Sequence, residues 1–408
     1  MLLARSDERV KPERARLGDW YWDTLVNPNN PGDVWAYAWE SIWARDLAKL
    51  RALGVNCIRV YSMLYKQIGL NGEIPTETTY PTLSKFTHRK FLDLCWNNGK
   101  NPIYVIVGIP MDPLLYRVDA NTTAIQYYWE HVLVDTAKDL EKHPAVLGFT
   151  VGNEVDAPGY TWDNANPDSK KVQYWWAQLE KYAQMVKAVA PNKMVGIANH
   201  DFREIVGVSK KYMGTCTSLD FWGVNSYQTL NFDSVFGTDG GPGYNDVTGV
   251  ALKPVILTEW GMPATGHHDP NDRFSIYSNT ATETKTADLV AEVLPKAYQQ
   301  PLCAGATYFE FCDEWWKQDQ PNGVKAILYK WYGGPPNPGF PNGYWDDEGF
   351  GVYSIERAGY DGSNPKVSQL PPYFNWPDPY YNGPYQPDVL TERTPLAEAI
   401  RQTFKTLQ

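Results

Sequence analysis

Short apolar runs alternate with longer segments of helical periodicity along most of the chain. The runs are nearly continuous in Val, Ile, Leu and Phe, which is typical of parallel strands buried on both faces. Seven runs have this character: 56–61, 102–107, 147–155, 194–199, 219–225, 254–259 and 305–311. The segments with helical periodicity are 41–53, 87–98, 122–142, 168–189, 202–212, 280–299 and 395–406. The alternation predicts an α/β protein with a parallel sheet covered by helices.

The most economical closed form of such a sheet is a (β/α)8 TIM barrel. Seven strands are legible, so the eighth should be the first strand and should lie before Ser41, although no run there is convincing. The alternative is an open doubly wound sheet. It is disfavoured because no run is followed by a GxGxxG or P-loop signature.

We expect one catalytic barrel over residues 1–408. Residues 1–19 are charged and poorly patterned, which predicts an irregular N-terminal segment. Residues 233–250 are rich in Gly, Asn and Asp and are expected to form a loop. Residues 313–392 are rich in Pro, Gly, Trp and Tyr and are too long for an ordinary connection, so we expect a long loop insertion packed on the barrel.

Two apolar runs end in a glutamate, and these ends are the centre of the functional hypothesis. One run ends in Gly152-Asn153-Glu154, and the other ends in Glu259-Trp260. The carboxyl ends of all barrel strands meet at one face, where barrel enzymes place their chemistry. Further polar or aromatic residues fall at or near predicted strand ends: Arg59, Tyr61, His200, Asp201, Asn225, Tyr227, Glu310, Glu314 and Trp315.

Two strand-end carboxylates are the equipment of a retaining glycosidase. One carboxylate attacks the anomeric carbon, while the other gives a proton to the leaving oxygen and later acts as a base. An arginine keeps the first carboxylate ionised, and a tyrosine hydroxyl orients it. An asparagine directly before the acid/base is placed to reach the sugar 2-hydroxyl.

These motifs resemble the clan of (β/α)8 retaining glycoside hydrolases, and most closely the β-1,3-glucanosyltransferases of fungal cell walls. The resemblance extends over most of the chain from about Arg45. The segments that carry it are Arg45-Asp46-Leu47, Leu53–Tyr61, Leu147–Val155, Asp220–Tyr227, Thr258–Gly261 and Tyr308–Phe311 with Glu314. The family usually has Tyr where this chain has Trp260, and its disulfide framework is not evident here.

The resemblance implies that Glu154 is the acid/base and Glu259 the nucleophile. It also implies that Arg59, Asn153 and Tyr227 support the pair, and that Tyr61, Asp201 and Glu310 lie in the cleft. Trp315 is our candidate for stacking on the sugar next to the nucleophile. Hydrolysis and glycosyl transfer both remain open. So do the alternatives of a β-mannanase, a cellulase, an exo-β-glycosidase or a glycan-binding barrel without catalysis.

The composition of the chain limits the classes of binding partner that we expect. A net charge of -10 disfavours nucleic acid and anionic membranes, which leaves an oligo- or polysaccharide as the expected partner. We expect neither a cofactor nor a metal, and His267-His268-Asp269 is predicted to be a solvated loop. The five cysteines form no CxxC pair. The N-terminal residues lack the apolar core of a signal peptide, so the chain as written is expected in the cytoplasm, or outside the cell if an upstream signal was removed.

Overall fold

The computed structural model describes residues 39–61, 63, 89–157, 161–163, 166, 168–269, 272–314, 333–356 and 389–407. The chain divides into two compact units. The first contains Val55–Trp260 and Val293–Tyr308, and the second contains Leu2–Gly54, Gly261–Glu292 and Phe309–Gln408. None of the described helices is long and apolar enough to cross a membrane.

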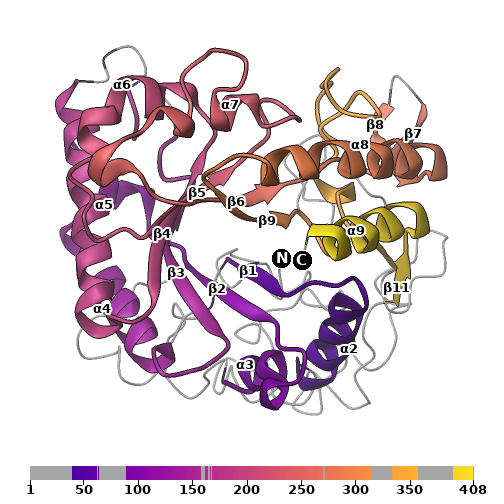
Figure 1. The fold of residues 1–408 in the computed structure, drawn as a ribbon, viewed down its shortest axis with the longest axis horizontal. Helices are drawn as coiled ribbons and strands as arrows, with labels where there is room; N and C mark the ends of the chain where they lie inside the picture. The colour runs from indigo at the N-terminus through magenta and orange to yellow at the C-terminus, as the bar shows by residue number, and fades with distance from the viewer. Residues whose placement is uncertain are drawn as a thin grey trace. The chain divides into compact units, whose positions relative to one another are not determined.

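The first unit is built around seven parallel strands (Figure 1). These are β1 (Cys57–Val60), β2 (Tyr104–Ile109), β3 (Val146–Asn153), β4 (Met194–His200), β5 (Phe221–Asn225), β6 (Val255–Trp260) and β9 (Cys303–Tyr308). Their order in the sheet follows the chain, and the two outermost strands, β1 and β9, contact each other. The sheet is therefore a nearly closed barrel of the TIM type. The predicted fold class and all seven predicted strands are confirmed, whereas the strand expected before Ser41 lies outside the described residues.

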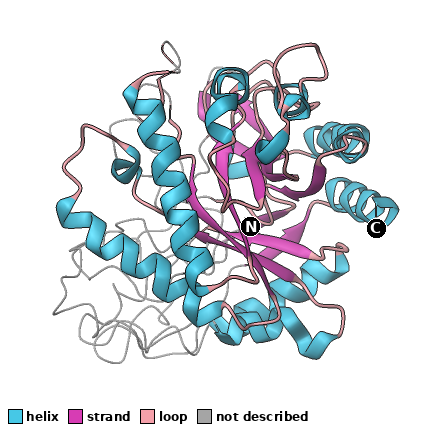
Figure 2. Ribbon diagram, turned by 60° about the vertical axis from the view of Figure 1, so that its left-hand side comes forward, coloured by secondary structure: helices cyan, strands magenta, loops and turns pink. Residues whose placement is uncertain are grey.

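Helices cover the strands of this unit (Figure 2). They are α3 (Arg89–Trp96), α4 (Thr123–Leu140), α5 (Lys170–Val189) and α6 (Arg203–Met213). A further helix, α8 (Thr280–Tyr298), precedes the strand β9 in the chain. The Ser169 hydroxyl caps α5 by accepting the amide of Val172 at 3.3 Å. Buried residues of α5 recur at helical spacing from Val172 to Val186, which is why this helix packs one face against the strands.

Aromatic residues from α5 and β5 form a dense part of this core. Trp162, Trp175, Trp176 and Trp222 are all at most 1% exposed. Consecutive pairs among them meet edge to face, with ring centroids 4.8 to 6.1 Å apart. These four tryptophans therefore stabilise the fold and do not offer a stacking surface for a sugar.

The segment 233–250 differs from the loop predicted for it. It contains the short helix α7 (Asp233–Phe236), the 3-10 turn η6 (Tyr244–Asp246) and the start of η7 (Gly249–Ala251). Ser234, Val235 and Phe236 are buried, so the segment is packed although its composition is that of a loop.

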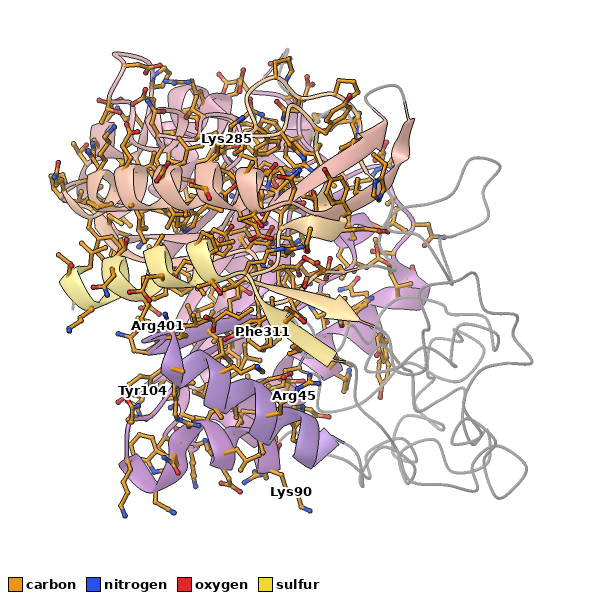
Figure 3. The ribbon with its side chains drawn as sticks, turned by 90° about the vertical axis from the view of Figure 1, so that its right-hand side faces the viewer. Arg45, Lys90, Tyr104, Lys285, Phe311 and Arg401 are labelled. Carbon is orange, nitrogen blue, oxygen red and sulfur yellow. The ribbon has the colours of Figure 1, made fainter. Side chains whose placement is uncertain are left out.

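The second unit contains α2 (Trp39–Ala52), α9 (Thr394–Leu407) and two antiparallel pairs. One pair is β7 (Thr265–Asp269) with β8 (Asp272–Ser278), and the other is β10 (Tyr353–Glu356) with β11 (Val389–Glu392). Arg401 on α9 donates to the carbonyl of Ala52 at 3.1 Å, which ties α9 to the end of α2 (Figure 3). The segment 313–392 was predicted as loop, so the β10–β11 pair within it corrects that expectation. Whether the segment packs on the barrel stays a prediction.

The prediction that His267 lies in a solvated loop is also wrong. His267 lies on β7, its side chain is 4% exposed, and its Nε2 lies 3.0 Å from an oxygen of the fully buried Asp346. Asp346 also accepts from the hydroxyl of Thr265 and from the side-chain amide of Asn342. The partners are 79 residues apart in the chain, so no local pattern could have indicated this cluster.

Close strand packing in the barrel requires glycine at Gly223 of β5. A Cβ there would lie 2.0 Å from the carbonyl oxygen of Ile197 and 2.7 Å from the methyl of Thr258. A Cβ at Gly305 of β9 would meet no described atom within 4 Å. The two glycines lie in strands of the same sheet, but only Gly223 leaves no room for a methyl group, so Gly305 can serve as its control.

We predict that Gly223→Ala lowers the free energy of unfolding by about 2 kcal/mol, because the added methyl group overpacks the sheet. Gly305→Ala is the control and should change stability far less. Urea denaturation followed by circular dichroism measures both. Equal effects of the two substitutions would contradict the packing described here.

Candidate active site

Glu154 follows β3 at a sharp turn of the backbone. Gly152 has φ +109° and Glu154 has φ +50°, both in the left-handed region. This conformation is common for glycine and costs free energy for glutamate. The amide of Glu154 is fixed by a 2.7 Å hydrogen bond to the carbonyl of Ala198 on β4. The backbone that carries the Glu154 carboxyl group is therefore held in a fixed conformation at the end of the strand.

The residues after Glu154 are anchored to the tryptophan core. The carbonyl of Val155 accepts the indole N–H of Trp175 at 2.9 Å and the hydroxyl of Thr161 at 2.5 Å. Val155 itself is fully buried. The position of Glu154 is thus determined on both sides, by β4 before it and by α5 after it.

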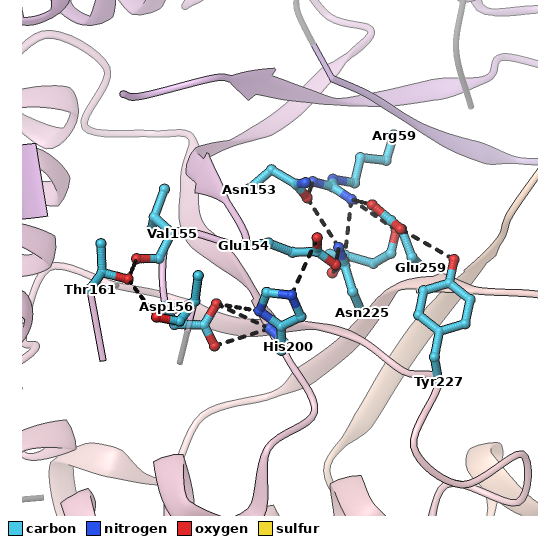
Figure 4. Close-up of polar contacts among 12 residues, drawn as sticks. Arg59, Asn153, Glu154, Val155, Asp156, Thr161, His200, Asn225, Tyr227 and Glu259 are labelled. Carbon is cyan, nitrogen blue, oxygen red and sulfur yellow. Dashed lines mark hydrogen bonds and ion pairs between the residues drawn. The ribbon is translucent and has the colours of Figure 1, made fainter. Parts of the chain in front are cut away.

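Glu259 lies on β6 in an ion pair with Arg59 of β1. The Arg59 Nη1 donates to Glu259 Oε1 at 2.9 Å, and the hydroxyl of Tyr227 donates to Oε2 at 3.2 Å (Figure 4). The side chains of Arg59 and Glu259 are 1% and 9% exposed. The ring of Tyr61 lies below the guanidinium at 4.3 Å, a favourable cation–π arrangement. Each buried charge therefore has a partner, as buried ions require.

Two asparagines connect the two carboxylates. Asn225 Nδ2 donates to Glu154 Oε1 at 3.0 Å and to Asn153 Oδ1 at 3.1 Å. Asn153 Oδ1 also accepts Arg59 Nη2 at 2.6 Å. The hydroxyl of Thr258 donates to Asn225 Oδ1 at 2.8 Å and fixes the orientation of this amide. A continuous network thus runs from Glu154 to the Arg59–Glu259 pair.

The surroundings raise the pKa of Glu154 above its ordinary value. The largest cause is the removal of water from around the carboxyl group, and the negative charge of Glu259 adds to it. The charge of His200 and the hydrogen bond from Asn225 act in the opposite direction and are outweighed. Glu154 is therefore the carboxyl of the two that favours keeping a proton.

His200, at the end of β4, lies between Glu154 and Asp156. Its Nδ1 is 2.9 Å from Asp156 Oδ1, and its Nε2 is 3.4 Å from Glu154 Oε2. Burial opposes a charge on His200, but the hydrogen bond and charge of Asp156, together with Glu154 and Asp201, raise the pKa of the imidazole to about 9. The sequence did not single out Asp156. Its position two residues after Glu154 is the sequence feature that could have identified it.

Asp201 supports the loop that carries Tyr227. One carboxylate oxygen accepts the amides of Tyr227 and Gln228 at 2.9 and 2.8 Å and the hydroxyl of Ser234 at 2.9 Å. Asp201 is 5% exposed. Its carboxylate is thus occupied in holding Tyr227 in position toward Glu259.

The remaining predicted residues are Trp260, Glu310, Glu314 and Trp315. Trp260 is 2% exposed and packs edge to face with Phe232 and Tyr308. Glu310 and Glu314 lie in the second unit and are buried there, at 1% and 0% exposure. Trp315 lies outside the described residues. The first unit therefore assembles eight predicted residues in one network: Arg59, Tyr61, Asn153, Glu154, His200, Asn225, Tyr227 and Glu259.

Within the described ranges, no group of three or more His, Cys, Asp or Glu side chains is arranged to hold a metal ion. The carboxylates of the site instead face guanidinium, amide, phenol and imidazole donors. These donors suit proton transfer and the stabilisation of charge on organic groups.

Comparison with known proteins gives matches in sequence and in structure. No family model matches the chain. Over 241 residues the chain is 26% identical to the probable 1,3-beta-glucanosyltransferase GAS3 of Saccharomyces cerevisiae, a match that covers 54% of this chain and 40% of that protein. The chain therefore matches less than half the length of this curated relative.

The structural matches concern the fold. A GH5_18 protein from Streptomyces cattleya, solved in complex with GlcNAc, aligns with a TM-score of 0.52 and 13% identity over 91% of this chain and 76% of that one. A variant of the same protein in complex with Manb1-4GlcNAc aligns with a TM-score of 0.51 and 14% identity over 91% and 77% of the two chains. At this identity the likeness is one of architecture.

The resemblance inferred from the sequence motifs is thus confirmed. The chain has a barrel fold shared with a structure of glycoside hydrolase family 5, and over part of its length it is similar to a glucanosyltransferase. Together the comparisons show the barrel architecture of the (β/α)8 glycoside hydrolases.

Proposed function

We propose that the protein is a retaining β-glycoside hydrolase or transglycosylase that acts on a β-linked glucan by double displacement. The observation that carries the proposal is the contrast between two strand-end carboxyl groups in one hydrogen-bonded network. Glu259 is ion-paired with Arg59 and oriented by Tyr227. Glu154 has a raised pKa and lies next to it. Such a pair is what a nucleophile and an acid/base need.

In the first step, Glu259 attacks the anomeric carbon and forms a covalent ester. The bond to the leaving oxygen breaks, and the protonated Glu154 donates its proton to that oxygen. The Arg59 ion pair keeps the Glu259 carboxylate ionised and oriented until attack. Asn153 presents its side chain beside the same guanidinium, where it supports the sugar 2-hydroxyl in this proposal.

In the second step, Glu154 acts as a base. It removes a proton from water or from a sugar hydroxyl, whose oxygen attacks the anomeric carbon. The ester bond to Glu259 breaks and its electron pair returns to that carboxylate. Water as acceptor gives hydrolysis, and a sugar gives transfer. Two displacements leave the anomeric configuration unchanged.

A β-1,3-glucan is the favoured substrate, and both transfer and hydrolysis belong to the proposal. Both preferences are supported by the similarity to the probable 1,3-beta-glucanosyltransferase. The same catalytic pair also serves β-mannanases, cellulases and exo-β-glycosidases, so the identity of the sugar needs its own test.

The first prediction concerns the nucleophile. Glu259→Gln should lower kcat by a factor on the order of 10^4 or more, because an amide cannot form the covalent intermediate. Gln keeps an oxygen for Arg59 to donate to, so the variant should stay folded by circular dichroism. Glu292→Gln, at an exposed position of α8, is the control and should retain full activity. Activity in Glu259→Gln would refute the mechanism and would reopen a purely glycan-binding role.

The second prediction separates the acid/base from the nucleophile. In Glu154→Gln, substrates with natural sugar leaving groups should lose about 10^2-fold or more in rate, since they need a proton donor. Dinitrophenyl glycosides need none, so their first step should be nearly unchanged. Added azide should then restore turnover and yield a β-glycosyl azide. An equal loss on both substrate classes without azide rescue would argue against this role.

The third prediction concerns substrate and stereochemistry. Incubation with laminari-, cello- and manno-oligosaccharides should give the fastest turnover on the laminari series, with first products of β configuration by NMR. Products longer than the substrate would indicate transfer, and shorter products alone would indicate hydrolysis. An α-configured first product would refute the nucleophile assignment. Faster turnover on the cello- or manno-oligosaccharides would show that a β-1,3-glucan is not the preferred substrate.

A further inference from the structure

A half-buried histidine bridge beside Glu154 has no place in the two-step scheme above. His200 contacts carboxylates through both ring nitrogens, Asp156 through Nδ1 and Glu154 through Nε2. A neutral imidazole carries one N–H and one bare nitrogen lone pair, which would face one of the two carboxylates. The doubly protonated ring has a donor for each. The geometry therefore favours the imidazolium whenever Glu154 is ionised.

Asp156 is built to hold that cation. It is fully buried, and its two oxygens accept the backbone amide of His200 at 3.3 and 3.1 Å as well as the ring Nδ1. The ring of Phe202 stacks on the imidazole with centroids 4.7 Å apart and planes 25° apart. Stacking on an aromatic face is favourable for a cationic ring. The imidazole is thus fixed in angle and in distance from Glu154.

Within the described part of the chain, the other ionisable groups near this bridge do not supply a competing cation. Asp201 follows His200 on the same strand end and adds negative charge. Tyr244 of η6 faces Asp156 and Asp201, and its burial together with those two charges raises the pKa of its phenol, so it stays neutral. Arg59 is directed to Glu259 and Asn153. Among the residues that the structure describes, His200 is therefore the cation that contacts Glu154 directly.

This arrangement bears on the second half of the reaction, and the inference rests on the proposed function. While Glu259 is ionised, its charge helps Glu154 keep a proton. Once Glu259 is esterified that charge is gone, and Glu154 must be a carboxylate to accept the proton of the attacking water or sugar. We propose that His200, held as a cation by Asp156, is the positioning residue that stabilises the Glu154 carboxylate in this second step.

The proton balance is closed without His200 giving up a proton. The proton of the attacking hydroxyl goes to Glu154, the new bond forms from its oxygen to the anomeric carbon, and the ester electron pair returns to Glu259. His200 stays doubly protonated throughout. Its effect is electrostatic: it favours the ionised form of Glu154 in the free enzyme and in the glycosyl-enzyme alike.

The test is His200→Gln, which keeps an amide donor and removes the charge. His131→Gln, at an exposed histidine of α4, is the matched control. The probes are a laminari-oligosaccharide and dinitrophenyl β-laminaribioside, assayed for kcat and kcat/KM across pH. With the aryl glycoside the first step needs no acid, so kcat reports the second step.

We expect the pH profiles of His200→Gln to move upward by about one pH unit at both limbs, because a nearby cation no longer favours the Glu154 carboxylate. The acidic limb of kcat on the aryl glycoside follows Glu154 in the glycosyl-enzyme. The alkaline limb of kcat/KM on the oligosaccharide follows it in the free enzyme. On the aryl glycoside, kcat and KM should fall together near the acidic limb. A uniform loss of rate without displaced limbs would indicate a structural role only and would overturn the proposal.

A second measurement needs neither a substrate nor a stable His200 variant. Nuclear magnetic resonance titration of the imidazole Cε1–H in the unmodified protein should place the His200 transition near pH 9. Asp156→Asn should move it down toward the ordinary histidine value of about 6.5. A transition at or below that ordinary value in the unmodified protein would overturn the proposal.

Failure of this inference is distinguishable from failure of the proposed function. If Glu259→Gln is inactive and Glu154→Gln responds to azide while His200→Gln leaves both pH limbs in place, the double displacement stands and the role of His200 falls. If Glu259→Gln is active, the double displacement falls first, and His200 with it.

Discussion

The buried ion pair between Arg59 and Glu259 is the interaction on which the rest of the site depends. Its partners come from β1 and β6, which are not neighbours in the sheet, so the pair forms only when the strands curve into a barrel. Two charges with side chains at most 9% exposed are costly to remove from water, and loss of either partner would leave the other unpaired. Barrel closure and the chemistry of Glu259 therefore require the same contact.

The properties of the second carboxyl group, that of Glu154, have a different physical cause. Glu154 receives one amide donor from Asn225, and partial removal of water from around its carboxyl group is the largest cause that raises its pKa. Its backbone is held in the left-handed region by β4 on one side and by the tryptophan core on the other. The free-energy cost of that conformation is met by the rigid surroundings. The raised pKa of Glu154 thus has the removal of water as its largest cause, whereas Glu259 is held in place by a guanidinium.

Much of this arrangement follows from the sequence because parallel strands buried on both faces leave a strong local pattern. The seven apolar runs end within about three residues of the observed strands, and the rule that strand ends converge brought Glu154, Glu259, Arg59 and Asn225 together before any coordinates were known. The sequence failed where partners are distant or patterns are weak. β7 reads Thr-Gly-His-His-Asp, which has no apolar alternation, and the partner of His267 is Asp346. The last apolar run was read to 311, whereas β9 ends at Tyr308, and the prediction that Glu310 and Glu314 lie in the cleft stays a prediction.

Asp156 shows a further limit of reasoning from strand ends. That reasoning selects residues by where a side chain emerges, and it says nothing of which groups adjust the charge of the selected residue. Asp156 lies beyond the strand, is fully buried, and holds His200 against Glu154, while its own negative charge also adds to the raised pKa of Glu154. Raising the pKa of Glu154 by excluding water serves proton donation but hinders the later return to a carboxylate. A fixed cation on one oxygen and a neutral amide on the other moderate that effect without abolishing it, since the pKa of Glu154 remains raised in their presence. In the proposed mechanism, the balance between exclusion of water and one adjacent cation, and not either alone, allows a single carboxyl group to serve first as acid and then as base.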